Sequence, residues 1–247
     1  MRKAEKRQKN TRTARNVGIA IVIVAIVFGV LKLVQGDSSS SNEVTCANVK
    51  PGTGTTATFT SPPPMTVDQT SLYVAVMDTS CGKITLGLNA VDFPVSVNNF
   101  VFLAQQKFYD GLDFVRASKN FTIQAGSPDN SQTGGPGYSV VGEVPKTTPA
   151  YPVGAFAMAK AGTEPAGTAG SQFFIITGKK NLSLPAEYAY VGKVTNGLAV
   201  AQKIESLAPK TGDGKPTTTV RINKVTVTVT ASAATTTTAP ATTTVAP

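Results

Sequence analysis

Three short blocks of the chain, at 114–126, 158–162 and 170–175, hold the side chains best suited to chemistry. The first contains Arg116, Phe121 and Gln124, and the third contains Gln172 and Phe174. Arginine stays charged at any working pH and presents several fixed N–H donors, so it can stabilise developing charge without exchanging a proton. The phenylalanines offer flat apolar walls for a rigid ring. This set suits substrate binding and electrostatic stabilisation.

Composition excludes several other kinds of catalysis. The chain has no histidine, which rules out Ser-His-Asp triads and Cys-His nucleophile pairs. Its two cysteines, Cys46 and Cys81, lie far apart with no histidine to complete a zinc site. We therefore expect neither a metal site nor a cofactor.

The order of the blocks is informative beyond their composition. A Phe-x-Arg is followed by Phe-x-x-Gln-x-Gly, an Ala-Met-Ala strand and Ser-Gln-Phe-Phe-Ile, at 114–116, 121–126, 157–159 and 171–175. This ordered set resembles the cyclophilin family of peptidyl-prolyl cis-trans isomerases, in its membrane-anchored bacterial form. Landmarks at 97–100, 108–111 and 133–135 extend the resemblance over most of 71–230.

The resemblance implies a role for each site residue. Arg116 would donate toward the prolyl nitrogen, and Phe121 and Phe174 would hold the proline ring above Leu184. Gln124 and Gln172 would bind the substrate backbone and help to orient Arg116, whereas Phe173 would face the core. The catalytic residues implied are Arg116, Phe121 and Gln124, and the substrate-binding residues are Thr122, Ala159, Lys160, Gln172, Phe174, Leu184 and Tyr188.

Several positions depart from the family pattern. Thr122 stands at the usual methionine, Lys160 at the usual asparagine, Ser183 at the usual tryptophan and Tyr188 at the usual histidine. Without the indole donor, we expect cyclosporin to bind weakly.

The reaction itself is compatible with a chain that has no histidine. Rotation about an X-Pro bond breaks amide resonance but makes and breaks no covalent bond. The site needs only a dry pocket for the proline ring and donors that favour the twisted amide. The partners expected are proline-containing polypeptides, chiefly unfolded exported proteins. A non-catalytic proline-binding or chaperone module of the same fold, and a wall-associated structural ectodomain, are the alternatives.

The pattern between these motifs consists mostly of short strands. Residues 72–77 and 83–88 flank a turn and predict a hairpin, and Pro94 opens a helix with one apolar face. Further strands are expected near 155–159, 172–177, 190–194 and 220–229, with a second helix near 198–207. The predicted fold is mainly β: a closed antiparallel β-barrel with two flanking α-helices, preceded by one transmembrane helix.

The ends of the chain predict a membrane anchor and a tail. An apolar run at 17–34 is close to the length that spans a bilayer, and seven basic residues among the first 15 place the N-terminus in the cytoplasm. A cleaved signal peptide is the alternative. Residues 1–15 supply +6 of the net charge of +9, so nucleic-acid binding is not expected. The predicted parts are a basic cytoplasmic tail, an anchor, an irregular linker, the isomerase domain and a Thr/Ala/Pro-rich disordered tail, at 1–16, 17–34, 35–70, 71–230 and 231–247.

The catalytic domain is thus expected outside the cytoplasmic membrane. In an oxidising compartment the two cysteines, Cys46 and Cys81, are expected to form a disulfide, the alternative being two unpaired thiols. The Gly-, Thr- and Pro-rich stretch up to Pro64 is not expected to bury a core.

Overall fold

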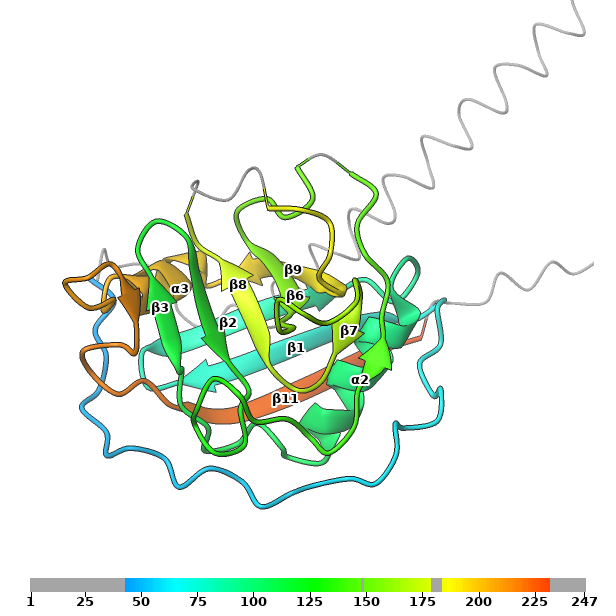
Figure 1. The fold of residues 1–247 in the computed structure, drawn as a ribbon, viewed down its shortest axis with the longest axis horizontal. Helices are drawn as coiled ribbons and strands as arrows, with labels where there is room; N and C mark the ends of the chain where they lie inside the picture. Colours follow the sequence, from blue (N-terminus) through cyan, green and yellow to red (C-terminus); the bar gives the residue numbers. More distant parts are fainter. Residues whose placement is uncertain (1–42, 148, 179–183, 232–247) are drawn as a thin grey trace, which may run out of the picture. The chain divides into compact units, whose positions relative to one another are not determined.

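A computed structural model describes residues 43–147, 149–178 and 184–231 of the chain. Its secondary structure is short strands with two helices among the described residues (Figure 1). The helices are α2 (Pro94–Gln105) and α3 (Leu198–Glu205). The strands are β1 (Leu72–Thr79), β2 (Gly82–Leu88), β3 (Arg116–Ser118), β4 (Thr122–Ala125), β5 (Val140–Val141), β6 (Ala155–Met158), β7 (Thr168–Ala169), β8 (Phe173–Ile176), β9 (Tyr190–Asn196), β10 (Asp213–Gly214) and β11 (Ile222–Thr230).

The predicted hairpin and first helix are confirmed. Strands β1 and β2 pair antiparallel, and their inward residues alternate with more exposed ones, as a half-buried sheet requires. Helix α2 begins at Pro94, whose fixed φ suits the first helical turn. Its apolar face at Val97, Phe100, Val101 and Ala104 is buried against the sheet.

The prediction of a closed barrel is wrong. Nine strands form one curled sheet in the order β10-β3-β4-β8-β6-β9-β2-β1-β11, so β10 and β11 are its two edges. The segment before β3 approaches β11 through the backbone bonds Phe114 N to Val220 O and Gly111 N to Ile222 O, at 2.8 and 2.7 Å. Only one isolated bridge, Asp113 to Arg221, forms there. Because β10 has two residues and β3 has three, this edge is too short to continue the ladder onto β11.

The two faces of the sheet belong to different apolar clusters. In β8, Phe173 and Ile175 join the main core, whereas Phe174 and Ile176 join a smaller cluster on the other side. Strand β6 follows the same alternation. The two-residue period of a strand therefore separates the scaffold from the face that carries the candidate site.

Residues 43–70, here called the strap, form no helix or strand but follow the outside of the sheet (Figure 1). Thr55 N donates to Pro128 O at 2.7 Å, and Phe59 N donates to Pro136 O at 2.8 Å. The Phe59 ring packs against the main core and lies 5.0 Å from the ring of Phe102. Val67 is buried as well. The expectation that the stretch up to Pro64 does not bury a core is therefore wrong at Phe59, which is partly buried against the main core, whereas Val67 lies beyond that stretch.

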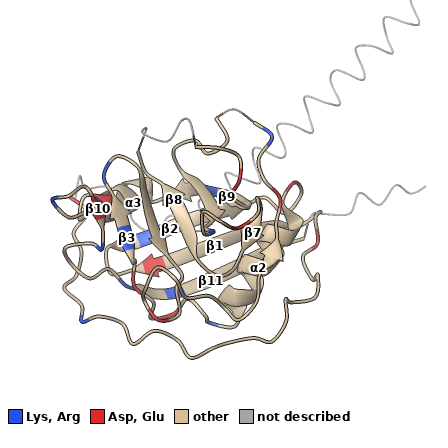
Figure 2. Ribbon diagram, viewed as in Figure 1, with Lys and Arg blue, Asp and Glu red and all other residues tan. Residues whose placement is uncertain are grey.

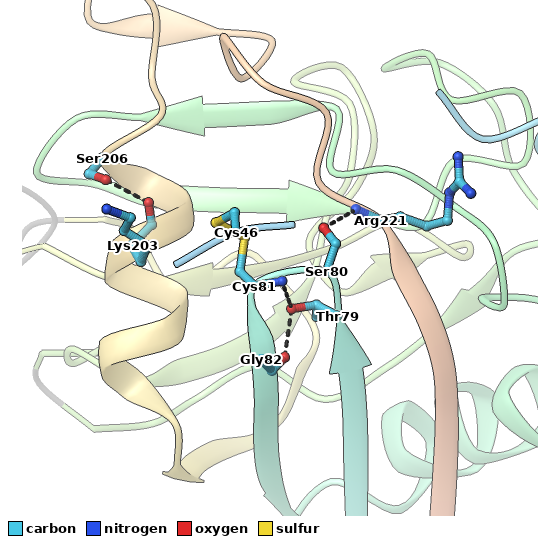
Figure 3. The surroundings of a disulfide bond; sticks show 8 residues. All are labelled: Cys46, Thr79, Ser80, Cys81, Gly82, Lys203, Ser206 and Arg221. Atoms are coloured by element: carbon cyan, nitrogen blue, oxygen red, sulfur yellow. Dashed lines mark hydrogen bonds between the residues drawn. A yellow bond between two sulfur atoms is a disulfide. The ribbon is translucent and has the colours of Figure 1, made fainter. Parts of the chain in front are cut away.

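The predicted disulfide is confirmed. Cys46 in the strap and Cys81 in the β1–β2 turn are joined by an S–S bond of 2.05 Å (Figure 3). Ala47 N donates to Ser80 O at 2.7 Å beside it. The bond fixes the start of the strap to the first hairpin.

Among the described residues, no helix is long and apolar enough to cross a bilayer. The predicted span at 17–34 lies outside those residues. So does most of the predicted Thr/Ala/Pro-rich tail.

Candidate active site

Strand register brings the separate sequence motifs into one row. Arg116 of β3 pairs with Gln124 of β4, Gln124 pairs with Phe174 of β8, and Phe174 pairs with Ala157 of β6. Directly paired residues on adjacent strands project to the same face of a sheet. Their side chains therefore share the face opposite the main core, although the residues are separated by up to 58 positions (174 − 116).

Arg116 is held on two sides. Its Nε and Nη2 donate to Oδ1 and Oδ2 of Asp213, each at 2.7 Å, and its guanidinium carbon lies 5.5 Å from the centre of the Phe121 ring. The side chain is 27% exposed. The hydrogen bonds and charge of Asp213 raise the pKa of Arg116, with a smaller contribution from Tyr188, and outweigh the opposing effect of burial. The guanidinium is thus permanently charged and oriented.

The two predicted glutamines form a chain of their own. Gln124 Nε2 donates to Gln172 Oε1 at 2.9 Å, and Gln172 Nε2 donates to the carbonyl of Gly134 at 2.8 Å. Within the described residues, the Arg116 side chain donates its hydrogen bonds to Asp213 and forms none with either glutamine. The prediction that the glutamines orient Arg116 is therefore wrong for this arrangement; they fix each other instead.

Aromatic side chains gather at the other end of the row. The ring centres of Phe174 and Tyr188 are 5.2 Å apart in an edge-to-face arrangement, and Leu184 packs into the same cluster. Tyr151 completes it: its hydroxyl donates to Tyr188 O at 2.7 Å and accepts from Tyr188 N at 2.8 Å. Burial raises the pKa of Tyr151. This cluster forms an apolar wall in which the buried Tyr151 hydroxyl fixes the backbone of Tyr188.

Lys160 and Thr122 do not present their side chains to solvent. The Lys160 side chain is 2% exposed, and its Nζ lies 3.5 Å from Glu187 Oε2 and 5.5 Å from the centre of the Tyr188 ring. Thr122 is buried, and its hydroxyl donates to Ile175 O at 2.7 Å. Ala159 N donates to Gln172 O, which ties the end of β6 to the start of β8. A substrate contact at Lys160 would therefore use the main chain, while Thr122 has no exposed group to offer.

A surface hollow of about 590 Å³ adjoins Arg116. It contains Phe121 but none of Phe174, Leu184 and Tyr188. The structure therefore divides the predicted site residues between a charged hollow and an aromatic cluster. Its lining residues are Arg116, Ser118, Lys119, Asn120, Phe121, Thr211, Gly212 and Asp213.

Three further participants were not predicted as site residues, although Gly134 lies in the 133–135 landmark. Asp213 lies 97 positions from Arg116, Tyr151 lies 37 from Tyr188, and Gly134 contributes only its carbonyl. None of them belongs to a periodic apolar pattern. For Asp213, the flanking glycines at 212 and 214 are a local signal of a tight turn. A turn signal does not reveal which side chain Asp213 contacts.

Comparison with known proteins places this geometry in a family. The family model for cyclophilin-type peptidyl-prolyl cis-trans isomerases matches residues 74–227. The peptidyl-prolyl cis-trans isomerase of Helicobacter pylori is 39% identical over 136 residues, covering 53% of this chain and 79% of the relative. Peptidyl-prolyl cis-trans isomerase B of Bacillus subtilis is 39% identical over 124 residues, covering 50% and 84%.

Solved structures agree with the sequence relatives. A crystal structure of a cyclophilin-type peptidyl-prolyl cis-trans isomerase of Cryptosporidium parvum superposes with a TM-score of 0.56 at 25% identity, covering 64% of this chain and 98% of that one. A second crystal structure of that protein, obtained in the presence of the dipeptide Ala-Pro, has a TM-score of 0.55 at 26% identity. With the family model matching more than half of the chain and the row of Arg116, Gln124 and Phe174 in place, this chain belongs to the cyclophilin-type peptidyl-prolyl cis-trans isomerases.

Proposed function

We propose that this chain interconverts the cis and trans forms of X-Pro bonds at the face that carries Arg116 and Phe174. One observation carries the proposal. The charged guanidinium of Arg116 lies over an aromatic ring and is held by two hydrogen bonds to a carboxylate. Arg116 lies in the same row of paired strand residues as Gln124 and Phe174. The uncatalysed reaction has a barrier of roughly 18–20 kcal/mol because rotation abolishes amide resonance. The site must therefore stabilise the twisted amide better than the planar one.

Arg116 supplies that preference. As the C–N bond twists, the lone pair localises on the prolyl nitrogen and becomes a hydrogen-bond acceptor. Asp213 engages Nε and one N–H of Nη2, which leaves both N–H groups of Nη1 and the second of Nη2 to donate to that nitrogen or to the adjacent carbonyl oxygen. Since the donor is already oriented, it costs little reorganisation at the moment of rotation. No proton is transferred, in keeping with a chain that has no histidine.

The aromatic cluster would hold the proline ring of the substrate, which stays in place while the amide bond rotates. The rings of Phe174 and Tyr188 lie edge to face, and Leu184 packs beside them. Together these three side chains offer an apolar surface to a pyrrolidine ring. With the ring fixed, rotation is confined to the segment on the N-terminal side of proline. Main-chain groups at Ala159 and Lys160, with the Gln124 and Gln172 carboxamides, would hold that segment. Recognition of a proline-containing peptide is supported by the related crystal structure obtained with Ala-Pro.

The substrates proposed are unfolded exported or cell-surface proteins, acted on by a catalytic domain anchored outside the cytoplasmic membrane. Two observations support this location. The apolar run at 17–34 follows a strongly basic tail. The Cys46–Cys81 disulfide is typical of oxidising compartments. Protease added to cells with a permeabilised wall should digest the domain; protection until the membrane is lysed would contradict this topology.

The isomerase activity is tested with a short X-Pro peptide and the full-length chain. Wild type should accelerate exchange, and Arg116→Ala should lower kcat by about 100-fold or more, as expected for loss of one preorganised donor. Arg116→Lys is the matched control, because it keeps the charge but loses the planar fork; it should recover little of the rate.

The same assay addresses the non-catalytic alternative. A folded wild-type chain that binds proline peptides without accelerating exchange would identify a binding module. An Arg116→Ala protein with an unchanged thermal midpoint and unchanged kcat would refute the catalytic role of Arg116.

A further inference from the structure

We infer that Asp213 is a positioning residue for the reaction, acting through Arg116 by fixing which edge of the guanidinium faces the substrate. The inference rests on the proposed function and adds to it a residue outside every motif of the sequence. Its basis is a two-point contact between side chains on adjacent strands, in which both carboxylate oxygens accept from Arg116 at 2.7 Å.

The contact restricts the orientation of Arg116 more than a single hydrogen bond could. A planar guanidinium that donates through Nε and one Nη to both oxygens of a carboxylate has its plane and its rotation fixed. The Phe121 ring then limits movement out of that plane, since it lies 5.5 Å from the guanidinium carbon. The two N–H groups of Nη1 and the second N–H of Nη2 remain for a substrate.

Asp213 is itself well placed to act as an anchor. It lies in β10, where its partner in the ladder is Ser118 of β3, two residues from Arg116. Lys119 N donates to Gly212 O at 2.8 Å, and Gly212 N donates to Pro209 O at 2.7 Å, so the turn that carries Asp213 is fastened on both sides. Gly212 has φ of +87°, a conformation that favours glycine. The short edge strand β10 thus lies beside β3, the strand that carries Arg116 (Figure 2).

The location of the pair argues against a purely structural role. Both residues line the 590 Å³ hollow, and their side chains are 27% and 48% exposed for Arg116 and Asp213. Pairs with this much exposure contribute little to folding, because solvent screens them. The glutamines that were expected to orient Arg116 bond to each other instead. Within the described residues, Asp213 provides the hydrogen bonds that orient the guanidinium.

The test uses the full-length chain and three substitutions at one position. Asp213→Asn keeps the shape but loses the charge and one acceptor, Asp213→Ala removes the group, and Asp213→Glu restores a carboxylate. We expect Asn and Ala to lower kcat by between about 10- and 100-fold, the range that follows from misplacing a catalytic group by about 1 Å. KM should change less than kcat, and Glu should recover part of the loss. Asp92→Asn, an exposed carboxylate in the turn before α2, is the matched control and should behave as wild type.

A double-mutant cycle separates action through Arg116 from any other role. In an Arg116→Ala background, Asp213→Asn should have no further effect on kcat. An equal loss in both backgrounds, or a wild-type kcat for Asp213→Asn, would overturn the inference. Loss of the distinct Arg116 Nε–H resonance in Asp213→Asn, observed by NMR with ¹⁵N-labelled arginine, would support it. Failure of the folded wild-type chain to accelerate exchange would instead refute the proposed function, so the two failures are distinguishable.

Discussion

The two ends of the candidate site are built from different forces. At the charged end, Arg116, Asp213 and the Gln124–Gln172 pair are fixed by hydrogen bonds between strands near the short edge of the sheet. At the aromatic end, Phe174, Tyr151 and Tyr188 are fixed mainly by packing in a cluster separate from the main core.

This difference suggests a division of labour. Hydrogen bonds fix donors at the place where charge develops during rotation. Apolar contacts hold the proline ring without discriminating between the cis and trans forms of the X-Pro bond. Interactions made only in the transition state change kcat, and those made equally in the ground state change KM. Substitutions at the charged end should therefore act on kcat, and those at the aromatic end on KM and stability.

Removing Phe174 gives the largest expected change in stability. Phe174→Ala leaves a cavity beside Tyr151 and Tyr188 and should lower the free energy of unfolding by about 4 kcal/mol. In protein that remains folded at low temperature, KM should rise more than kcat falls. Chemical denaturation and peptide titration measure the two effects. A loss confined to kcat would contradict the division between the two ends.

The disulfide tests whether the strap supports the charged end. Replacing Cys46 and Cys81 by serine should cost about 3 kcal/mol of stability, because the bond closes a loop of 35 residues. The strap also backs the segment 128–136, whose Gly134 carbonyl accepts from Gln172. We therefore expect kcat to fall modestly while KM is unchanged. Urea unfolding with and without reductant measures the first effect, and an effect on KM alone would show that the strap supports the aromatic end.

Tyr151→Phe is a smaller change at the aromatic end. It removes only the hydroxyl that bonds both backbone groups of Tyr188, and should cost about 1.5 kcal/mol while preserving the ring contacts. KM should rise slightly, with kcat unchanged. Tyr190→Phe is a matched control, since that ring also stacks on Tyr151. Equal effects of the two substitutions would show that the bonds to Tyr188 are not special.

Local patterns predicted six of the strands, the two helices and the two sides of β8, but not β3 and β4, which carry Arg116 and Gln124. The alternation of Phe173 and Phe174 follows directly from a two-residue period, and the structure places the first in the main core and the second at the site. The ordered motifs also indicated that Arg116 and Gln124 belong to one site, and the structure places them in directly paired positions of β3 and β4. These features depend on neighbours close in sequence or on an established family pattern.

Contacts between distant polar residues could not be predicted in the same way. The Arg116–Asp213 pair depends on how a two-residue edge strand docks, and no local periodicity encodes that docking. Phe59 was missed because one apolar residue in a Gly-, Thr- and Pro-rich stretch gives no pattern. The open sheet was missed because short strands indicate a barrel without fixing whether its edges meet.

The smallest expected effect is that of pH, and it should be equally small at both ends. At the charged end, Asp213 raises the pKa of Arg116, so the guanidinium stays charged. At the aromatic end, burial raises the pKa of Tyr151 and Tyr190, which therefore stay neutral in the folded state. The chain has no histidine to titrate near neutrality. We expect kcat/KM to be constant between about pH 6 and 9, the interval between ordinary carboxyl and tyrosine pKa values.

Above this interval, stability should be lost as the pH rises. Burial raises the pKa of Tyr138 to about 12, so the unfolded chain releases its proton first, near pH 10, and unfolding becomes progressively more favourable as the pH rises toward 12. Both ends should then fail together, through unfolding. NMR exchange measurements of isomerisation at constant ionic strength avoid a pH-dependent coupling enzyme, and circular dichroism at each pH reports folding. A bell-shaped rate profile centred near neutrality in fully folded protein would show that a titrating group takes part in catalysis, contrary to a mechanism based on a permanently charged Arg116.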